Sequence, residues 1–267
     1  MRYETILYDV SDRIATITFN RPERLNAISP QMVQELRDAY TAAEADTEVW
    51  TLLVTGNGRA FCAGADVTEI PADGRVIYPE PYLSTFPQWE APQEATPPFR
   101  SMTKPIVVAV NGICCGAGLD LLTTGDISIA SERAEFFDPH VSIGLVSGRE
   151  SVRLARVLPL GVAMRVALMG KQERMSAQRA YELGLISEIV PHDDLPRRAR
   201  EIATLINRNA PLAVRGTRLA IRKGMDLPLH EAEILAEAFR ERVLRTDDAK
   251  EGPAAFVEKR DPDWRCS

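Results

Sequence analysis

The sequence lacks an apolar run long enough to cross a membrane. A spanning helix needs about 18 or more consecutive apolar residues, whereas the longest stretch here, Ile106–Val110, suffices only for a strand. The fourth residue is an acid, Glu4, and no long apolar segment follows it. We therefore expect neither a membrane anchor nor a secretory signal peptide.

Cysteine and excess positive charge are also scarce. The cysteines form one adjacent pair and two distant singles: Cys62, Cys114, Cys115 and Cys266. This spacing suits neither a disulfide framework nor a zinc site, so we expect free thiols, no metal and a cytoplasmic location. The formal net charge of -6 argues against a nucleic-acid-binding surface.

What remains is the composition of a globular enzyme, with 267 residues of which 45% are hydrophobic and 26% charged. Short β-rich runs are predicted at 5–10, 14–19, 49–55, 106–110 and 126–130. Ser29 and Pro30 predict a helix start after the second run, and a glycine-rich helical stretch separates the last two runs. This alternation indicates an α/β fold whose helices cover a mostly parallel sheet.

Helical patterns dominate after Gly144, with one late strand predicted at 186–190. The predicted helices span 151–158, 162–169, 176–183, 195–209, 212–223 and 229–245. A terminal helix is predicted over 247–259, interrupted early by Gly252 and Pro253. We divide the chain into an α/β core, 1–195, and a helical C-terminal region, 196–267.

The segment 71–105 carries eight of the 18 prolines, together with several aromatic residues. Prolines at this density prevent a long regular helix. One interpretation is a loop that covers a substrate and lines an acyl pocket with its aromatics. The other is a surface insertion that packs against the body or a neighbouring subunit.

Two motifs place small residues where a strand runs into a helix start. They are Arg59–Val67 and Lys104–Asp120, the second containing the strand 106–110. Small residues let a ligand approach the backbone, and N–H groups at a helix start are unpaired donors. Each motif can supply one N–H to a single oxygen, which is the arrangement of an oxyanion hole. For the first motif, a tight strand-to-helix turn is the alternative explanation.

These two motifs, in this order and spacing, resemble the crotonase (enoyl-CoA hydratase/isomerase) superfamily. Further matching segments are 19–22, Asn26-Ala27, Gly125-Asp126, Gly170 with 175–177, Ala180, Gly184-Leu185 and 251–260. The resemblance implies a spiral of ββα units followed by a C-terminal helical trimerisation region, in a homotrimer or dimer of trimers. It also implies an acyl-CoA thioester substrate, with coenzyme A as part of the substrate and no separate cofactor.

The resemblance implies that the backbone N–H groups of Ala65 and Ala117 hold the thioester oxygen. The two glutamates that activate water in typical hydratases are replaced here by Asp120 and His140. An imidazole exchanges protons near neutral pH but lacks the two acceptor oxygens of a carboxylate. Glu150 is a further candidate, because some relatives carry extra catalytic carboxylates near this point. A helix-start role for Asp120, a structural role for His140 and a first-turn role for Glu150 are the alternatives.

For coenzyme A, the resemblance implies contacts from the N-terminal segment, the first motif and the C-terminal helix. The residues are Arg24, Ala63, Asp66, Phe256 and Lys259. Thr68 stands where a lysine is common in hydratases. Surface charge without a ligand is the alternative for the basic residues.

Three functions follow from this reading. The first is hydration of a 2-enoyl-CoA by a hydratase-like lyase, in which Asp120 and His140 manage the water and the proton. The second is isomerisation or carbon–carbon bond hydrolysis through the same enolate, since a histidine-containing site is known among β-diketone-cleaving relatives. The third is a catalytically silent CoA-binding homologue, which the replacement of both glutamates would also produce.

Overall fold

The computed structural model describes residues 3–69 and 102–267. Most of the proline-rich segment 71–105 lies outside the described residues. In the part of the chain that is described, no helix is long and apolar enough to cross a membrane.

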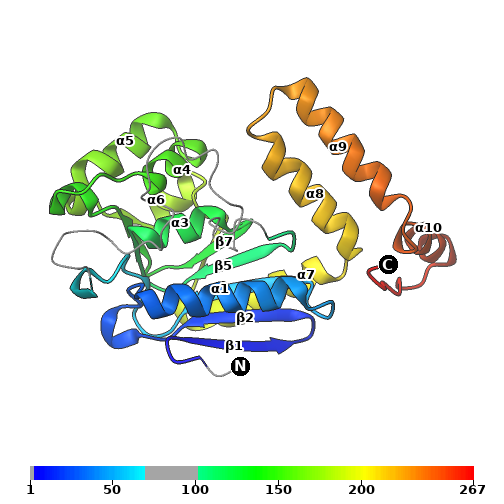
Figure 1. Cartoon of the computed structure of the whole chain (residues 1–267), viewed down its shortest axis with the longest axis horizontal. Coiled ribbons are helices and arrows are strands. Elements are labelled where there is room, and N and C mark those ends of the chain that lie inside the picture. Colours follow the sequence, from blue (N-terminus) through cyan, green and yellow to red (C-terminus); the bar gives the residue numbers. More distant parts are fainter. Residues whose placement is uncertain (1–2, 70–101) are drawn as a thin grey trace.

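A six-stranded sheet forms the centre of the molecule (Figure 1). Its strands, in spatial order, are β1 (Ile6–Ser11), β2 (Ile14–Phe19), β3 (Thr51–Gly56), β5 (Ile106–Val110), β7 (Ile127–Ser131) and β10 (Glu188–Val190). β1 and β2 pair as an antiparallel hairpin, and every later pairing in this sheet is parallel. The predicted hairpin and mostly parallel sheet are confirmed, with strand ends shifted by one or two residues.

A second, four-stranded sheet was not predicted. It consists of β4 (Ala60–Cys62), β6 (Ile113–Cys115), β8 (Glu135–Phe137) and β9 (Met175–Ser176), with β8 and β9 antiparallel and the other pairs parallel. Its strands have two or three residues each, which is too short for apolar alternation to show. Each of β4 and β6 follows a strand of the first sheet and precedes one of the two small-residue loops.

The helices of the body cover these sheets. They are α1 (Pro30–Ala45), α3 (Ala117–Thr124), α4 (Arg149–Val157), α5 (Leu160–Met169), α6 (Ala177–Glu182) and α7 (Leu195–Asn207). Short 3-10 turns lie at η1 (Pro22–Arg24), η2 (Val67–Glu69), η5 (His140–Ile143), η6 (Gly170–Gln172) and η7 (His192–Asp194). The predicted start of α1 is confirmed, because the Ser29 hydroxyl accepts from the N–H of Met32 at 3.1 Å.

α7 packs on the central sheet, although it follows the predicted boundary after residue 195. Its Leu195, Ala199 and Ala203 are buried in one cluster with Leu53 of β3 and Val107 of β5. The exposed helical region therefore begins only at α8.

The last three helices are α8 (Pro211–Gly224), α9 (Leu229–Val243) and α10 (Asp248–Glu258), here called the C-terminal arm, 211–258. α8 and α9 pair along their length and project from the body, and α10 follows α9 at the end of the pair where α8 begins (Figure 1). α9 has no buried residue.

The predicted interruption of the terminal helix is wrong. Pro253 lies inside a continuous α10, where its missing N–H removes one backbone hydrogen bond. Contacts from the chain end brace this turn. Arg260 pairs with Glu251 at 2.5 Å, and the Trp264 ring packs against Gly252.

Candidate active site

Two glycine loops meet at the edge where β4 and β6 end. Gly64 and Gly116 have φ angles of +93° and +52°, which side chains rarely adopt. A Cβ atom on Gly116 would lie 3.4 Å from the Cα of Gly64, tighter than most contacts of real Cβ atoms. Glycine at both positions therefore lets the two backbones approach each other directly.

The residue after each glycine presents a backbone N–H at this junction. The N–H of Ile28 donates to the Gly64 carbonyl at 2.8 Å, and the N–H of Asp66 donates to the Ile28 carbonyl at 3.0 Å, which fixes the chain on both sides of Ala65. Ala117 is the first residue of α3, where an N–H has no acceptor within the helix. Among the described residues, neither Ala65 nor Ala117 donates its N–H to another protein group. Both residues are partly exposed.

Asp120 lies one turn along α3 from Ala117 and is only 5% exposed. Its Oδ1 forms an ion pair with the Nε of Arg153 on α4, at 3.0 Å. The carboxylate therefore has a fixed orientation beside the loop that carries the Ala117 N–H.

His140 opens η5 and reaches the same junction from the other side. A Cβ on Gly116 would lie 3.6 Å from the Cε1 of His140. The Nδ1 of His140 is 2.5 Å from Oδ1 of Asp138, and the backbone N–H of His140 donates to the same oxygen at 3.1 Å. Because the partner is a carboxylate, we assign the proton to Nδ1, which leaves Nε2 as an acceptor.

Asp138 is fully buried, and Ser147 donates a hydroxyl to its other oxygen. Burial raises the pKa of Asp138, but hydrogen bonds from His140 and Ser147 outweigh it and hold the pKa below its usual range. The same hydrogen bond raises the pKa of His140, while burial of the ring lowers it by less. Asp138 was missed in the sequence, although an Asp-x-His spacing beside a candidate histidine is a usable signal.

Glu150 lies in the first turn of α4 and is 4% exposed. Its charge also contributes to the raised pKa of His140. The structure thus brings together four of the predicted residues, Ala65, Ala117, Asp120 and His140, with Glu150 close to the histidine.

Comparisons with known proteins identify the family of this chain. The family model described as enoyl-CoA hydratase/isomerase matches residues 9–266. The chain belongs to the enoyl-CoA hydratase/isomerase family. A crystal structure of an enoyl-CoA hydratase/isomerase from Mycobacterium paratuberculosis is 71% identical, with a TM-score of 0.92 over 100% of both chains.

Two curated relatives are named as hydratases. A probable enoyl-CoA hydratase of Mycobacterium bovis is 33% identical over 99% of both chains. A mevalonyl-coenzyme A hydratase of Aspergillus fumigatus is 36% identical over 95% of this chain and 92% of its own.

The residues predicted to bind coenzyme A fall into two groups in this family member. Arg24, exposed on η1, lies beside the first loop, because the N–H of Ala63 donates to the adjacent Leu25 carbonyl at 3.0 Å. Asp66 is 8% exposed and pairs with Arg21 at 3.0 Å. Asp66 also accepts a hydrogen bond from the hydroxyl of Thr68 at 2.6 Å.

Phe256 and Lys259 form the second group, at the end of α10. The arm carries them away from the loops of the same chain (Figure 1). Phe256 is 85% exposed.

The cysteines are free, as predicted. Three of the cysteines are buried within the strands β4 and β6: Cys62, Cys114 and Cys115. Burial raises the pKa of Cys62 and of Cys115 to about 12, and it raises the pKa of Cys114 strongly as well. A thiol with a raised pKa is a poor nucleophile, so these residues serve packing.

Proposed function

We propose that this protein adds water across the C2–C3 double bond of a 2-enoyl-CoA thioester, with no cofactor beyond the coenzyme A of the substrate. The observation that carries the proposal is the meeting of two unpaired backbone N–H groups with a buried carboxylate and an Asp-bound imidazole. Names of relatives that are hydratases of CoA thioesters support it.

The N–H groups of Ala65 and Ala117 are proposed to form the oxyanion hole. When water adds at C3, negative charge moves through C2 onto the thioester oxygen. Two fixed donors stabilise this enolate by about 3–4 kcal/mol each. Because both donors are main-chain groups, the adjacent glycines matter more than the alanine side chains.

The proton is proposed to pass through His140. Its Nε2 accepts a proton from water while the water oxygen bonds to C3, and the same nitrogen returns a proton to C2 as the enolate collapses. Asp120, oriented by Arg153, accepts a hydrogen bond from the other O–H of the water, which stays on the new hydroxyl group, and so holds the water for attack. Asp138 acts as a positioning residue, since it fixes the ring and the tautomer. Glu150 is a further candidate for proton transfer near the His140 ring.

Coenzyme A is proposed to bind at Arg24, Ala63 and Asp66 of one subunit. Phe256 and Lys259 would then complete the site of a neighbouring copy, since their own arm carries them away from the loops. This requires a homo-oligomer, either a trimer or a dimer of trimers. A cytoplasmic location fits the free thiols.

Carbon–carbon bond hydrolysis is the second candidate, favoured by the hydrogen bond between His140 and the buried Asp138. A histidine base beside an oxyanion hole can activate water for attack on a carbonyl carbon of a β-diketone. Product analysis separates the two reactions, because hydrolysis yields two fragments and hydration yields one 3-hydroxyacyl-CoA.

The experiment follows loss of the conjugated double bond of crotonyl-CoA and longer enoyl-CoAs by absorbance. Ala117→Pro removes one proposed oxyanion donor at a helix position that accepts proline, and kcat should fall about a hundredfold or more. Leu160→Pro, at the first position of the exposed start of α5, is the matched control and should retain activity. Acyl-CoA binding without turnover of any substrate would instead identify a silent homologue.

A further inference from the structure

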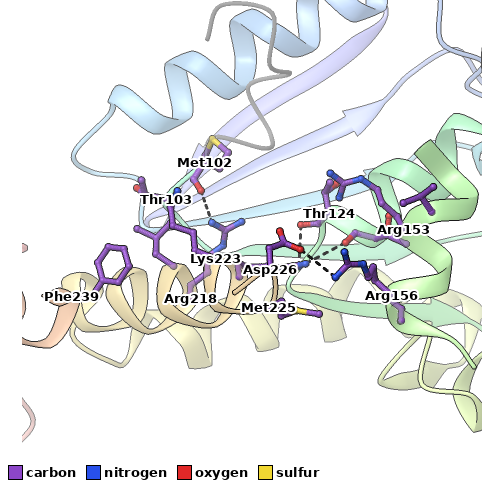
Figure 2. Close-up of a pocket in the computed structure, with 15 residues that line it drawn as sticks. Met102, Thr103, Thr124, Arg153, Arg156, Arg218, Lys223, Met225, Asp226 and Phe239 are labelled. Carbon is purple, nitrogen blue, oxygen red and sulfur yellow. Dashed lines mark hydrogen bonds and ion pairs between the residues drawn. The ribbon is translucent and has the colours of Figure 1, made fainter. Parts of the chain in front are cut away.

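A cavity of about 680 Å³ lies between α8 and the body of the same chain (Figure 2). Thr123 and Thr124 of α3 line it from one side, and residues of α4 and α8 from the others. Its size is that of a small-molecule site.

The cavity adjoins the candidate active site. Arg153 lines it and is also the residue that pairs with Asp120 at 3.0 Å. Thr124 lies one helical turn beyond Asp120, which is about 5.4 Å along α3. The Ala117 N–H lies one turn in the opposite direction. An acyl chain whose thioester oxygen sits at Ala117 therefore points past Asp120 toward the cavity, whereas coenzyme A leads away from it.

Part of the lining is apolar. Met102, Val152, Val157, Leu219 and Met225 contribute to the walls, and Phe239 of α9 closes one end. Walls of this kind suit the methylene groups of an acyl chain.

The rest of the lining carries more positive than negative charge. Five basic side chains line the cavity, Arg153, Arg156, Arg218, Arg222 and Lys223. They face three carboxylates: Asp120, Asp126 and Asp226.

Two of the four arginines serve the fold. Arg218 and Arg222 both pair with Asp126, at 2.6 Å and 2.9 Å. They also donate to backbone carbonyls, Arg218 to that of Met102 and Arg222 to those at the end of α3. These contacts hold α8 against the body.

Arg156 and Lys223 remain available for a ligand. The Arg156 pair with Asp226 spans 3.3 Å, and both side chains are more than half exposed, so it is a weak ion pair. Lys223 forms no ion pair with any residue that the structure describes. A cavity whose lining combines apolar walls with two such cations suits a chain with an anionic end.

We propose that this cavity binds the distal carboxylate of the acyl group. The substrate class is then the mono-CoA thioester of an unsaturated dicarboxylic acid, with Arg156 and Lys223 holding the far carboxylate. This inference rests on the proposed function for the identity of the thioester site.

The test compares dodecanedioyl-CoA with dodecanoyl-CoA, which have the same chain length and differ in the terminal group. A long chain is needed because Ala117 and Thr124 lie about 10 Å apart along α3. Both ligands are saturated, so calorimetry measures binding without turnover. Wild-type protein should bind dodecanedioyl-CoA about tenfold more tightly or better, which is the range of a charge-assisted hydrogen bond. Lys223→Gln and Arg156→Gln should each reduce this ratio to about threefold or less and leave dodecanoyl-CoA binding unchanged.

Lys171→Gln is the matched control, since it removes the same charge from an exposed lysine outside the cavity. It should keep the wild-type ratio, and thermal melts should show that all variants are folded. Equal binding of the two ligands by wild-type protein would overturn the proposal. Equal weakening of both ligands by Lys223→Gln would also overturn it, because the lysine would then contact the CoA phosphates.

The binding ratio is independent of the reaction. A protein that prefers dodecanedioyl-CoA but hydrates no enoyl-CoA contradicts the proposed function and supports the carboxylate site. A protein that hydrates crotonyl-CoA and binds the two ligands equally supports the proposed function and contradicts the carboxylate site.

Discussion

The body and the C-terminal arm of this chain differ in how much of their own surface they bury. All five residues of β5 are buried, and the strand contributes to two buried clusters of the body, with Val108 in one and Val107 in the other. α9 of the arm buries none of its residues, and α8 buries only Pro211 and Gly216. The arm leaves apolar side chains exposed, among them Ile221, Leu229 and Ile234.

Because of this difference, the two parts of the proposed site, the catalytic groups and the residues predicted to bind coenzyme A, have different structural support. The body places the donors and the proton-transferring groups with contacts that it makes itself. The arm carries Phe256 and Lys259, predicted to bind coenzyme A, on a support with little buried surface of its own. Exposed apolar surface of this extent marks an interaction site, so we expect another copy to cover the exposed face of the arm.

The largest effect is expected from a test of whether catalysis depends on side chains of the body and not on those of the arm. His140→Ala removes the proposed base, and kcat/KM for a hydrated enoyl-CoA should fall about a thousandfold. His230→Ala, an exposed residue of α9, is the matched change in the arm and should leave the rate within about twofold. An unchanged rate in His140→Ala would make that histidine structural and break the comparison.

An added methyl group should destabilise the body more than the arm. A Cβ on Gly112 would lie 2.1 Å from the backbone oxygen of Arg59, so Gly112→Ala should lower the free energy of unfolding by about 3 kcal/mol. In the arm, a Cβ on Gly216 would lie 3.2 Å from a terminal methyl of Val243, which can move. Gly216→Ala should therefore change the same free energy by less than about 1 kcal/mol. Denaturant titrations of both variants check this, and equal losses would contradict it.

The sequence predicts the body better than the details of its site. The hairpin, the strand at β5 and the Ser29 cap follow from local patterns, because each depends on residues near one another in the chain. β4, β6 and β8 have three residues each, so only their pairing in space defines them. Ala65 and Ala117 were found through a resemblance, because a backbone donor leaves no side-chain pattern beyond small residues.

Asp138 shows the limit of side-chain patterns. Its spacing from His140 is visible in the sequence, but its complete burial and its bond to Nδ1 depend on β8 pairing with β6. The placement of Phe256 far from the loops was also invisible, because local helical pattern does not tell which way an arm points.

Asp138→Asn tests whether the buried carboxylate tunes the base. Asparagine keeps the size of the side chain but loses the charge that raises the pKa of His140. A base works only when unprotonated, so activity rises with pH through its pKa. The acidic limb of kcat/KM in the wild type should lie above about pH 6.5, the ordinary histidine pKa. In Asp138→Asn this limb should move to lower pH, and the maximal rate should fall about tenfold. A lower rate with an unmoved limb would leave Asp138 a purely structural role.

The smallest effect on the stability of a single chain is expected for a substitution in the arm. Ile234 is 58% exposed on α9, so Ile234→Glu should change the free energy of unfolding of a single chain by less than about 0.5 kcal/mol. In an oligomer that covers this face, the same glutamate is buried without a partner, and light scattering should show dissociation toward the monomer. Leu168→Glu on α5 of the body, at 67% exposure, is the matched control and should keep the wild-type mass. Dissociation by Leu168→Glu but not by Ile234→Glu would mean that copies meet through the body, and the arm would then need another explanation for its exposed apolar face.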